Sequence, residues 1–99
     1  MLALPINPET DHLFESILSL ENLEECYQYF EDLCTVREVQ SIAQRLAVAS
    51  CLAGGQSYQQ TIAQTGASSA TVSRVKRCLD YGADGYRLVL SRMEEEATS

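Results

Sequence analysis

The fold is decided by the stretch Gly66-Ala67-Ser68-Ser69-Ala70-Thr71-Val72-Ser73-Arg74-Val75. Glycine adopts the left-handed backbone conformation without strain, so Gly66 is expected to end one helix and turn the chain. The hydroxyl groups of Ser68 and Ser69 then offer caps for a second helix from about Ser69 to Leu79. The stretch therefore predicts two short helices joined by a tight turn, which is the helix-turn-helix arrangement.

The first of these two helices begins at a capping box, Ser57-Tyr58-Gln59-Gln60. The serine hydroxyl accepts a hydrogen bond from the backbone N–H three residues later, while the glutamine side chain reaches back to the serine N–H. This helix is expected to run to about Thr65. The sequence thus predicts a helix-turn-helix over residues 57–79.

The second helix is predicted to have two different faces. Val72, Leu79 and either Val75 or Lys76 form an inward stripe at helical spacing. Small side chains at the start of the helix would let its backbone enter the major groove of DNA, where hydroxyl and methyl groups meet base edges. Arginines and the N–H groups at helix N-termini suit phosphates. The residues expected to contact DNA are Ser57, Gln59, Gly66, Ser68, Ser69, Ala70, Thr71, Ser73, Arg74 and Arg77.

A central core helix is expected over residues 35–55. It begins at the capping box Thr35-Val36-Arg37-Glu38 and ends at Gly54-Gly55, where glycine can close a helix. Its many small side chains would let other helices approach closely. This helix is therefore predicted to lie at the centre of the core.

The remaining helices follow from apolar residues that recur at three- and four-residue spacing. Two such stripes, separated near Ser19, predict helices within residues 1–34 that serve dimerisation. A loop at Gly82-Ala83-Asp84-Gly85 precedes a helix over residues 86–93, and an acidic tail occupies residues 94–99. Because β-branched alternation is missing, we expect a single all-α domain of five or six helices.

The charge distribution is uneven in a way that suits a DNA-binding protein. The formal net charge is −7, although duplex binding draws much of its free energy from neutralising phosphates. Nine of the fourteen acidic residues fall in residues 1–38, and the stretch Val39–Leu79 contains none. That stretch carries Arg45, Arg74, Lys76 and Arg77, so an acidic body is expected to present one basic element.

Several other classes of protein are not expected. The four cysteines lack metal-ligand spacing, and His12 is the chain's single histidine, so no metal site is predicted. Serines and Lys76 occur without an orienting base or an oxyanion loop, which argues against an enzyme. No signal peptide or membrane anchor is predicted, and a reduced, cytoplasmic location is expected.

The turn and second helix resemble those of Trp-repressor-like regulators, particularly the YerC/YecD branch, as does Tyr81-Gly82-Ala83-Asp84-Gly85-Tyr86. The resemblance extends upstream through Leu33-Cys34-Thr35-Val36-Arg37-Glu38, Arg45-Leu46-Ala47 and Gly54-Gly55, and covers roughly Leu23 to Tyr86. It implies an intertwined all-helical homodimer in which the N-terminal helices of one subunit wrap the other. The two helix-turn-helix motifs of the dimer would then lie on one face. The Trp repressor is a known example of how a helix-turn-helix docks on DNA.

The sequence departs from this family pattern in two places. Ile62-Ala63 lies one residue later than is usual in the branch, a slip that would rotate the apolar face of the helix by about 100°. The resemblance also implies an effector cleft formed by Thr35, Arg45, Arg74 and the residue at Val75, where tryptophan-binding members have glycine. A β-branched side chain there should block an indole ring, so tryptophan is not expected as a corepressor and no cofactor is predicted.

These observations predict a transcriptional regulator of double-stranded DNA, with repression favoured over activation. A homodimer would read a palindromic operator through the helix from Ser69 to Leu79 of each subunit, with no membrane partner and with any small-molecule effector unknown. The alternative is an acidic helical adaptor for other proteins that has lost DNA binding. Electrophoretic mobility shift at two salt concentrations distinguishes the two hypotheses.

Overall fold

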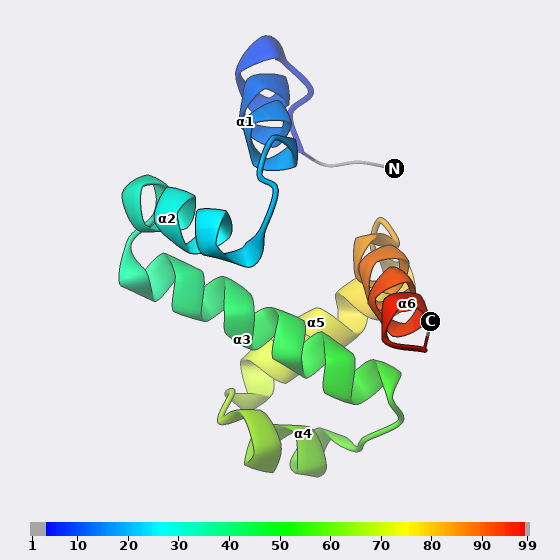
Figure 1. Ribbon diagram of the computed structural model, residues 1–99. Coiled ribbons are helices and arrows are strands. Elements are labelled where there is room, and N and C mark those ends of the chain that lie inside the picture. The colour runs from blue at the N-terminus through cyan, green and yellow to red at the C-terminus, as the bar shows by residue number, and fades with distance from the viewer. Residues whose placement is uncertain (1–3, 99) are drawn as a thin grey trace. The chain divides into compact units, whose positions relative to one another are not determined.

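The computed structural model describes residues 4–98, which form six helices and no strands (Figure 1). The all-α prediction is therefore confirmed. The chain divides into two compact units, residues 1–39 and residues 40–99, called here the N-terminal unit and the C-terminal unit. The helices are α1 (Pro8–Leu18), α2 (Leu23–Leu33), α3 (Val36–Ala53), α4 (Tyr58–Thr65), α5 (Ser69–Tyr81) and α6 (Gly85–Thr98).

The N-terminal unit has well-capped helices. The Asn7 side chain accepts from the backbone N–H of Thr10 at 2.8 Å, and Asn22 accepts from the N–H of Glu25 at 2.9 Å. An asparagine oxygen at this position satisfies one of the N–H groups that a helix start leaves without a partner. These caps define where α1 and α2 begin.

The apolar surface of the N-terminal unit remains open. Neither α1 nor α2 contains a buried residue, although both carry the predicted apolar stripes. A helix normally gains most of its stability by burying such a stripe. Residues 1–3 of the predicted dimerisation segment lie outside the described residues. The exposed large apolar residues are Leu4, Ile6, Leu13, Phe14, Leu18, Leu23, Tyr27, Leu33, Val36 and Val39.

Both predicted ends of α3 are confirmed. The N–H of Glu38 donates to the Thr35 hydroxyl oxygen at 3.1 Å, and the Thr35 N–H donates to the Glu38 carboxylate at 2.8 Å. At the other end, the Gln56 N–H reaches the carbonyl of Cys51 at 3.1 Å. The residue in the left-handed conformation is Gly55, with φ of +92°, and together these features form a Schellman motif.

The core of the C-terminal unit is built around α5. Of its six buried residues, Val72, Val75 and Leu79 come from α5. Helix α3, which the sequence places at the centre, contributes residues from its C-terminal half, and Figure 1 shows α5 passing behind that half. α4 and α6 complete the packing. The remaining core residues are Val48, Ala49 and Ala67, with Leu52, Ile62, Tyr86 and Leu90 packed against them.

The last two helices are longer than predicted. α5 continues past Leu79 to Tyr81, and α6 runs from Gly85 to Thr98. The prediction that this helix ends at residue 93 and is followed by an acidic tail is therefore wrong, because α6 continues through the glutamates to Thr98. Glutamate and alanine are good helix formers. Ser99 lies outside the described residues. No helix within residues 4–98 combines the length and apolar character needed to cross a bilayer.

Candidate nucleic-acid interface

The start of α4 has the predicted capping box. The N–H of Gln60 donates to the Ser57 hydroxyl oxygen at 3.1 Å, and the Ser57 N–H donates to the Gln60 side-chain oxygen at 2.9 Å. Gly66 then ends α4 in the left-handed conformation, with φ of +72°. Its N–H donates to the carbonyl of Ile62. The two signals that define this helix in the sequence are therefore both confirmed.

A threonine fixes the turn between α4 and α5. The Thr65 hydroxyl donates to the carbonyl of Thr61 at 2.7 Å and accepts from the N–H of Ala67 at 3.2 Å. The methyl group of Ala67 is buried in the core. The sequence predicts the turn from Gly66, and in the structure a side-chain hydrogen bond and a buried methyl group also hold it.

The unusual register of Ile62-Ala63 has a structural explanation. Thr61 is fully buried and takes the most inward position of α4, while Ile62 is half-buried and Ala63 is exposed. A buried hydroxyl is costly unless it forms a hydrogen bond, and Thr61 donates its own to the Ser57 carbonyl at 2.8 Å. The expected rotation of the inward face of α4 therefore places Thr61 in the core, where its hydroxyl forms a hydrogen bond within the helix.

The two-sided character of α5 is also confirmed. Ser68 caps the helix by accepting from the N–H of Thr71 at 3.1 Å. The inward stripe is Val72, Val75 and Leu79, each less than 5% exposed, so Val75 rather than Lys76 faces the core. The opposite surface, called the α5 face below, consists of five exposed residues: Ser69, Ala70, Ser73, Arg74 and Arg77.

The other predicted contact residues lie around the two helix starts and the turn. Ser57, Gln59, Gly66 and Ser68 are exposed, but the hydroxyls of Ser57 and Ser68 already serve as caps. Thr71 is half-buried, and its hydroxyl accepts from that of Ser68 at 3.1 Å. The hydroxyls of Ser57, Ser68 and Thr71 are thus engaged at the caps, whereas Gln59 and the backbone at Gly66 remain exposed.

The electrostatic contrast between the two units is strong. The N-terminal unit carries nine carboxylates and one arginine, a net charge of −8, whereas six cations and five carboxylates give the C-terminal unit +1. Within residues 4–98, no carboxylate lies within ion-pairing distance of Arg74 or Arg77. Both guanidinium groups therefore stay available for an anionic ligand.

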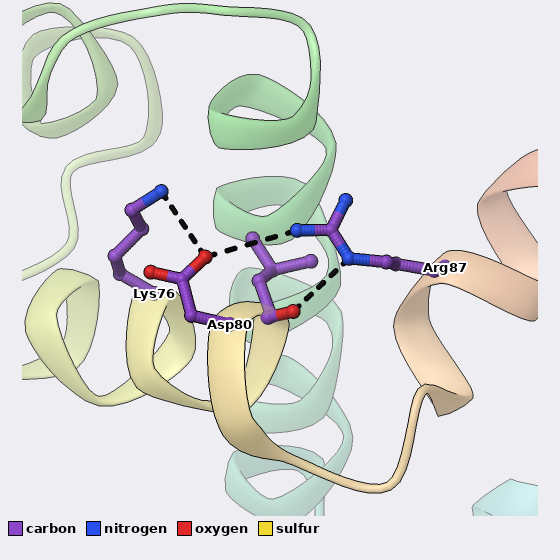
Figure 2. A network of polar contacts seen from close by, with 4 residues as sticks. Lys76, Asp80 and Arg87 are labelled. Carbon is purple, nitrogen blue, oxygen red and sulfur yellow. Dashed lines mark hydrogen bonds and ion pairs between the residues drawn. The ribbon is translucent and has the colours of Figure 1, made fainter.

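A polar network that the sequence did not predict lies at the end of α5 (Figure 2). Asp80 lies 3.3 Å from Lys76 Nζ and 3.7 Å from Arg87 Nη2, and Arg87 Nε donates to the carbonyl of Leu79 at 3.0 Å. The four-residue spacing of Lys76 and Asp80 is a recognisable helical ion pair. Arg87 carries no such local signal, because it follows a loop and belongs to α6.

The residues of the predicted effector cleft have diverse surroundings. Val75 is 1% exposed and belongs to the core, and the neighbouring Arg74 is exposed. Arg45 Nε makes a long 3.5 Å hydrogen bond to the Ser41 carbonyl within α3. Thr35 belongs to the N-terminal unit and serves the α3 capping box. The effector cleft stays a prediction.

The chain matches a known family over most of its length. A family model described as Trp repressor protein matches residues 8–94. The uncharacterized protein YerC of Bacillus subtilis is 58% identical over 90 residues, which cover 91% of this chain and 86% of that protein. The resemblance inferred from the turn and second helix is thereby confirmed.

Solved structures agree with the sequence match. A crystal structure assigned as a Trp repressor from Staphylococcus aureus gives a TM-score of 0.88 at 52% identity and covers 90% of this chain and 89% of that one. A TrpR-like protein from Eubacterium eligens gives 0.86 at 45% identity, with 89% and 91% covered. The chain therefore belongs to the Trp repressor family of helix-turn-helix regulators.

Proposed function

We propose that this protein is a sequence-specific regulator of transcription that binds double-stranded DNA as a homodimer and represses by occluding promoters. The observation that carries the proposal is the division of α5 into a buried stripe and an exposed face. The stripe of Val72, Val75 and Leu79 holds the helix against its own core. The opposite face is left to a ligand, and it carries two arginines and no carboxylate.

The α5 face has the chemistry of a major-groove reader. Ser69 and Ser73 supply hydroxyls that can donate to or accept from base edges, and the methyl of Ala70 can contact a thymine methyl. Arg74 and Arg77 are assigned to neutralise phosphates beside the groove. We assign a further phosphate contact to Gln59, an exposed residue near the start of α4. None of these roles requires a covalent or redox step, so the protein acts as a regulator without catalysis.

The open apolar surface of the N-terminal unit supports the homodimer. Its two helices contain no buried residue in the single chain, and a second copy would supply the missing core. Sedimentation equilibrium should give a dimer at micromolar concentration, and Leu23→Glu should shift it to monomer with loss of helix content. A wild-type monomer that keeps its full helix content would contradict the dimer.

The DNA-binding proposal is tested by selecting bound duplexes from a random pool. The expected result is a pair of inverted half-sites about 10 base pairs apart, the spacing of one helical turn. Mobility shift of the selected duplex should then weaken steeply between low and high salt. A protein-binding adaptor would enrich no sequence and show no salt-dependent shift.

We also propose that regulation does not use tryptophan. Val75 is β-branched and buried, and the family resemblance implies that tryptophan-binding members have glycine at this position. Filling that volume leaves no room for an indole ring without rearranging a well-packed core.

A further inference from the structure

The C-terminal end of α5 is held by a side chain from another helix. The last four carbonyl groups of any helix lack partners within it, and in α5 these begin at Cys78. The Cys78 carbonyl accepts from the N–H of Gly82 at 2.9 Å. The Leu79 carbonyl accepts from Arg87 Nε at 3.0 Å. A charged donor on an otherwise unpaired carbonyl makes a stronger hydrogen bond than a neutral one.

The same guanidinium compensates a carboxylate at an unfavourable place. Asp80 lies in the last turn of α5, where the helix dipole is negative and favours cations. Arg87 Nη2 and Lys76 Nζ both approach Asp80 Oδ1 (Figure 2). A planar guanidinium can bind the backbone carbonyl and the carboxylate at once through separate nitrogens, whereas a lysine ammonium is a single point donor.

Arg87 is itself anchored by the core. Tyr86, its neighbour, and Leu90, one turn later in α6, pack against the buried cluster that includes Leu79. The guanidinium thus spans between two elements that are each fixed by apolar packing. Arg77 lies two residues before Leu79, so any loosening of this helix end displaces a proposed phosphate contact.

We infer that Arg87 is a positioning residue for DNA recognition: by binding the Leu79 carbonyl and Asp80 it fixes the C-terminal end of α5 at the angle that the operator requires. The inference rests on the proposed function. It assigns Arg87 no contact with DNA, because Nε and Nη2 of its guanidinium face the Leu79 carbonyl and the Asp80 carboxylate.

The test compares Arg87→Ala with Arg92→Ala, which removes the same charge from an exposed arginine of the same helix. Affinities are measured for the selected duplex and for a scrambled duplex of the same composition. Arg87→Ala should lower the ratio of the two affinities by about tenfold, the order of one lost base contact. Its slope of affinity against salt should equal that of Arg92→Ala, whose affinity ratio should stay at the wild-type value.

Three results separate the hypotheses. If the wild-type protein binds neither duplex in a salt-dependent manner, the proposed function itself fails. If it binds but the Arg87→Ala ratio stays at the wild-type value, the positioning role is overturned. A salt slope reduced by about one relative to Arg92→Ala would also overturn it, since that marks a phosphate contact.

Arg87→Lys keeps the inference testable if the alanine variant does not fold. The lysine retains the charge beside Asp80 but cannot also hold the Leu79 carbonyl, so the affinity ratio should fall between those of wild type and Arg87→Ala. Circular dichroism confirms the helix content of each variant. A lysine variant with the wild-type ratio would show that charge alone is needed and would overturn the inference.

Discussion

The hydroxyl of Thr61 donates a hydrogen bond of 2.8 Å to the carbonyl of Ser57, one turn earlier in α4. The same carbonyl accepts from the Thr61 backbone N–H at 2.9 Å, so it keeps a partner even without the hydroxyl. Thr61 is fully buried. The buried position is therefore held by side-chain volume, and the hydroxyl is tolerated because it is satisfied locally.

Thr61→Val should accordingly be close to neutral. It preserves the volume and leaves no unpaired group, so the free energy of unfolding should stay within about 1 kcal/mol of wild type. Thr61→Ala, the matched variant, leaves a cavity and should cost about 1–2 kcal/mol. Urea denaturation of both measures the difference. A valine variant destabilised as much as the alanine variant would show that the hydroxyl, not the volume, is required.

Local signals in the sequence were sufficient for the helix ends that depend on a few adjacent residues. The capping boxes at Thr35 and Ser57, the serine cap at Ser68 and the glycine turn at Gly66 are each complete within four or five residues. Such hydrogen bonds form wherever the local chain is helical, whatever the rest of the fold does. This is why the helix-turn-helix could be located correctly.

Features that depend on other parts of the chain were not predictable in the same way. The Arg87 bond to Leu79 crosses a loop between two helices. The inward position of Thr61 depends on how α4 packs, and a polar residue gives no apolar signal there. The continuation of α6 past Met93 could not be predicted, because a run of glutamates is compatible both with an exposed helix face and with an irregular tail.

The capping box of α3 should make stability depend on pH. The backbone N–H of Thr35, and then its hydroxyl, donate to the Glu38 carboxylate and lower the pKa of Glu38 below its ordinary value of 4.5. The folded state thus favours the charged form, so Glu38 stabilises the fold above pH 4.5. This contribution should be lost as the pH falls from 4.5 through the lower folded pKa.

Glu38→Gln tests this dependence, because it keeps an acceptor for the Thr35 N–H but removes the titration. Unfolding free energies measured by urea between neutral and acidic pH should converge for wild type and Glu38→Gln below pH 4.5. Glu31→Gln, an exposed glutamate of α2, is the charge-matched control. Parallel curves for wild type and Glu38→Gln through this range would contradict the role of the carboxylate.

The loop between α5 and α6 requires glycine at one position but not at another. A Cβ atom at Gly82 would lie 2.4 Å from the carbonyl oxygen of Cys78 and 3.0 Å from its Cα, both backbone atoms that cannot move aside easily. Gly82→Ala should therefore cost at least about 1–3 kcal/mol, the usual cost of overpacking.

Gly85 is the matched control, because a Cβ there meets nothing within 4 Å. Gly85→Ala should be neutral or stabilising by up to about 1 kcal/mol, since alanine restricts the unfolded chain. Chemical denaturation of the two variants side by side makes the comparison. Equal stability of the two would mean that the loop relaxes freely and that the close approach at Gly82 is unimportant.

Calorimetry with L-tryptophan should give no saturable heat at millimolar ligand. The physical reason is the volume of Val75, which is buried among core side chains. Val75→Gly, which removes that volume, is the informative variant, although the lost burial and the helical glycine together should cost about 3 kcal/mol of stability. Saturable heat in the variant alone would identify Val75 as the block, and a micromolar dissociation constant for wild type would refute the prediction.

The salt dependence of DNA affinity should distinguish the roles of the two arginines of the α5 face from those of its serines. Each phosphate contact contributes about −0.9 to the slope of log affinity against log salt, so Arg74→Ala and Arg77→Ala should each reduce the slope by about one. Ser73→Ala removes a hydroxyl without changing charge, so it should alter the preferred sequence and leave the slope unchanged. Arg37→Ala, in the N-terminal unit, controls for net charge. If the arginine variants bind with the wild-type slope while Arg37→Ala changes it, the DNA-contacting surface lies elsewhere, because a slope counts only the phosphates that the protein neutralises.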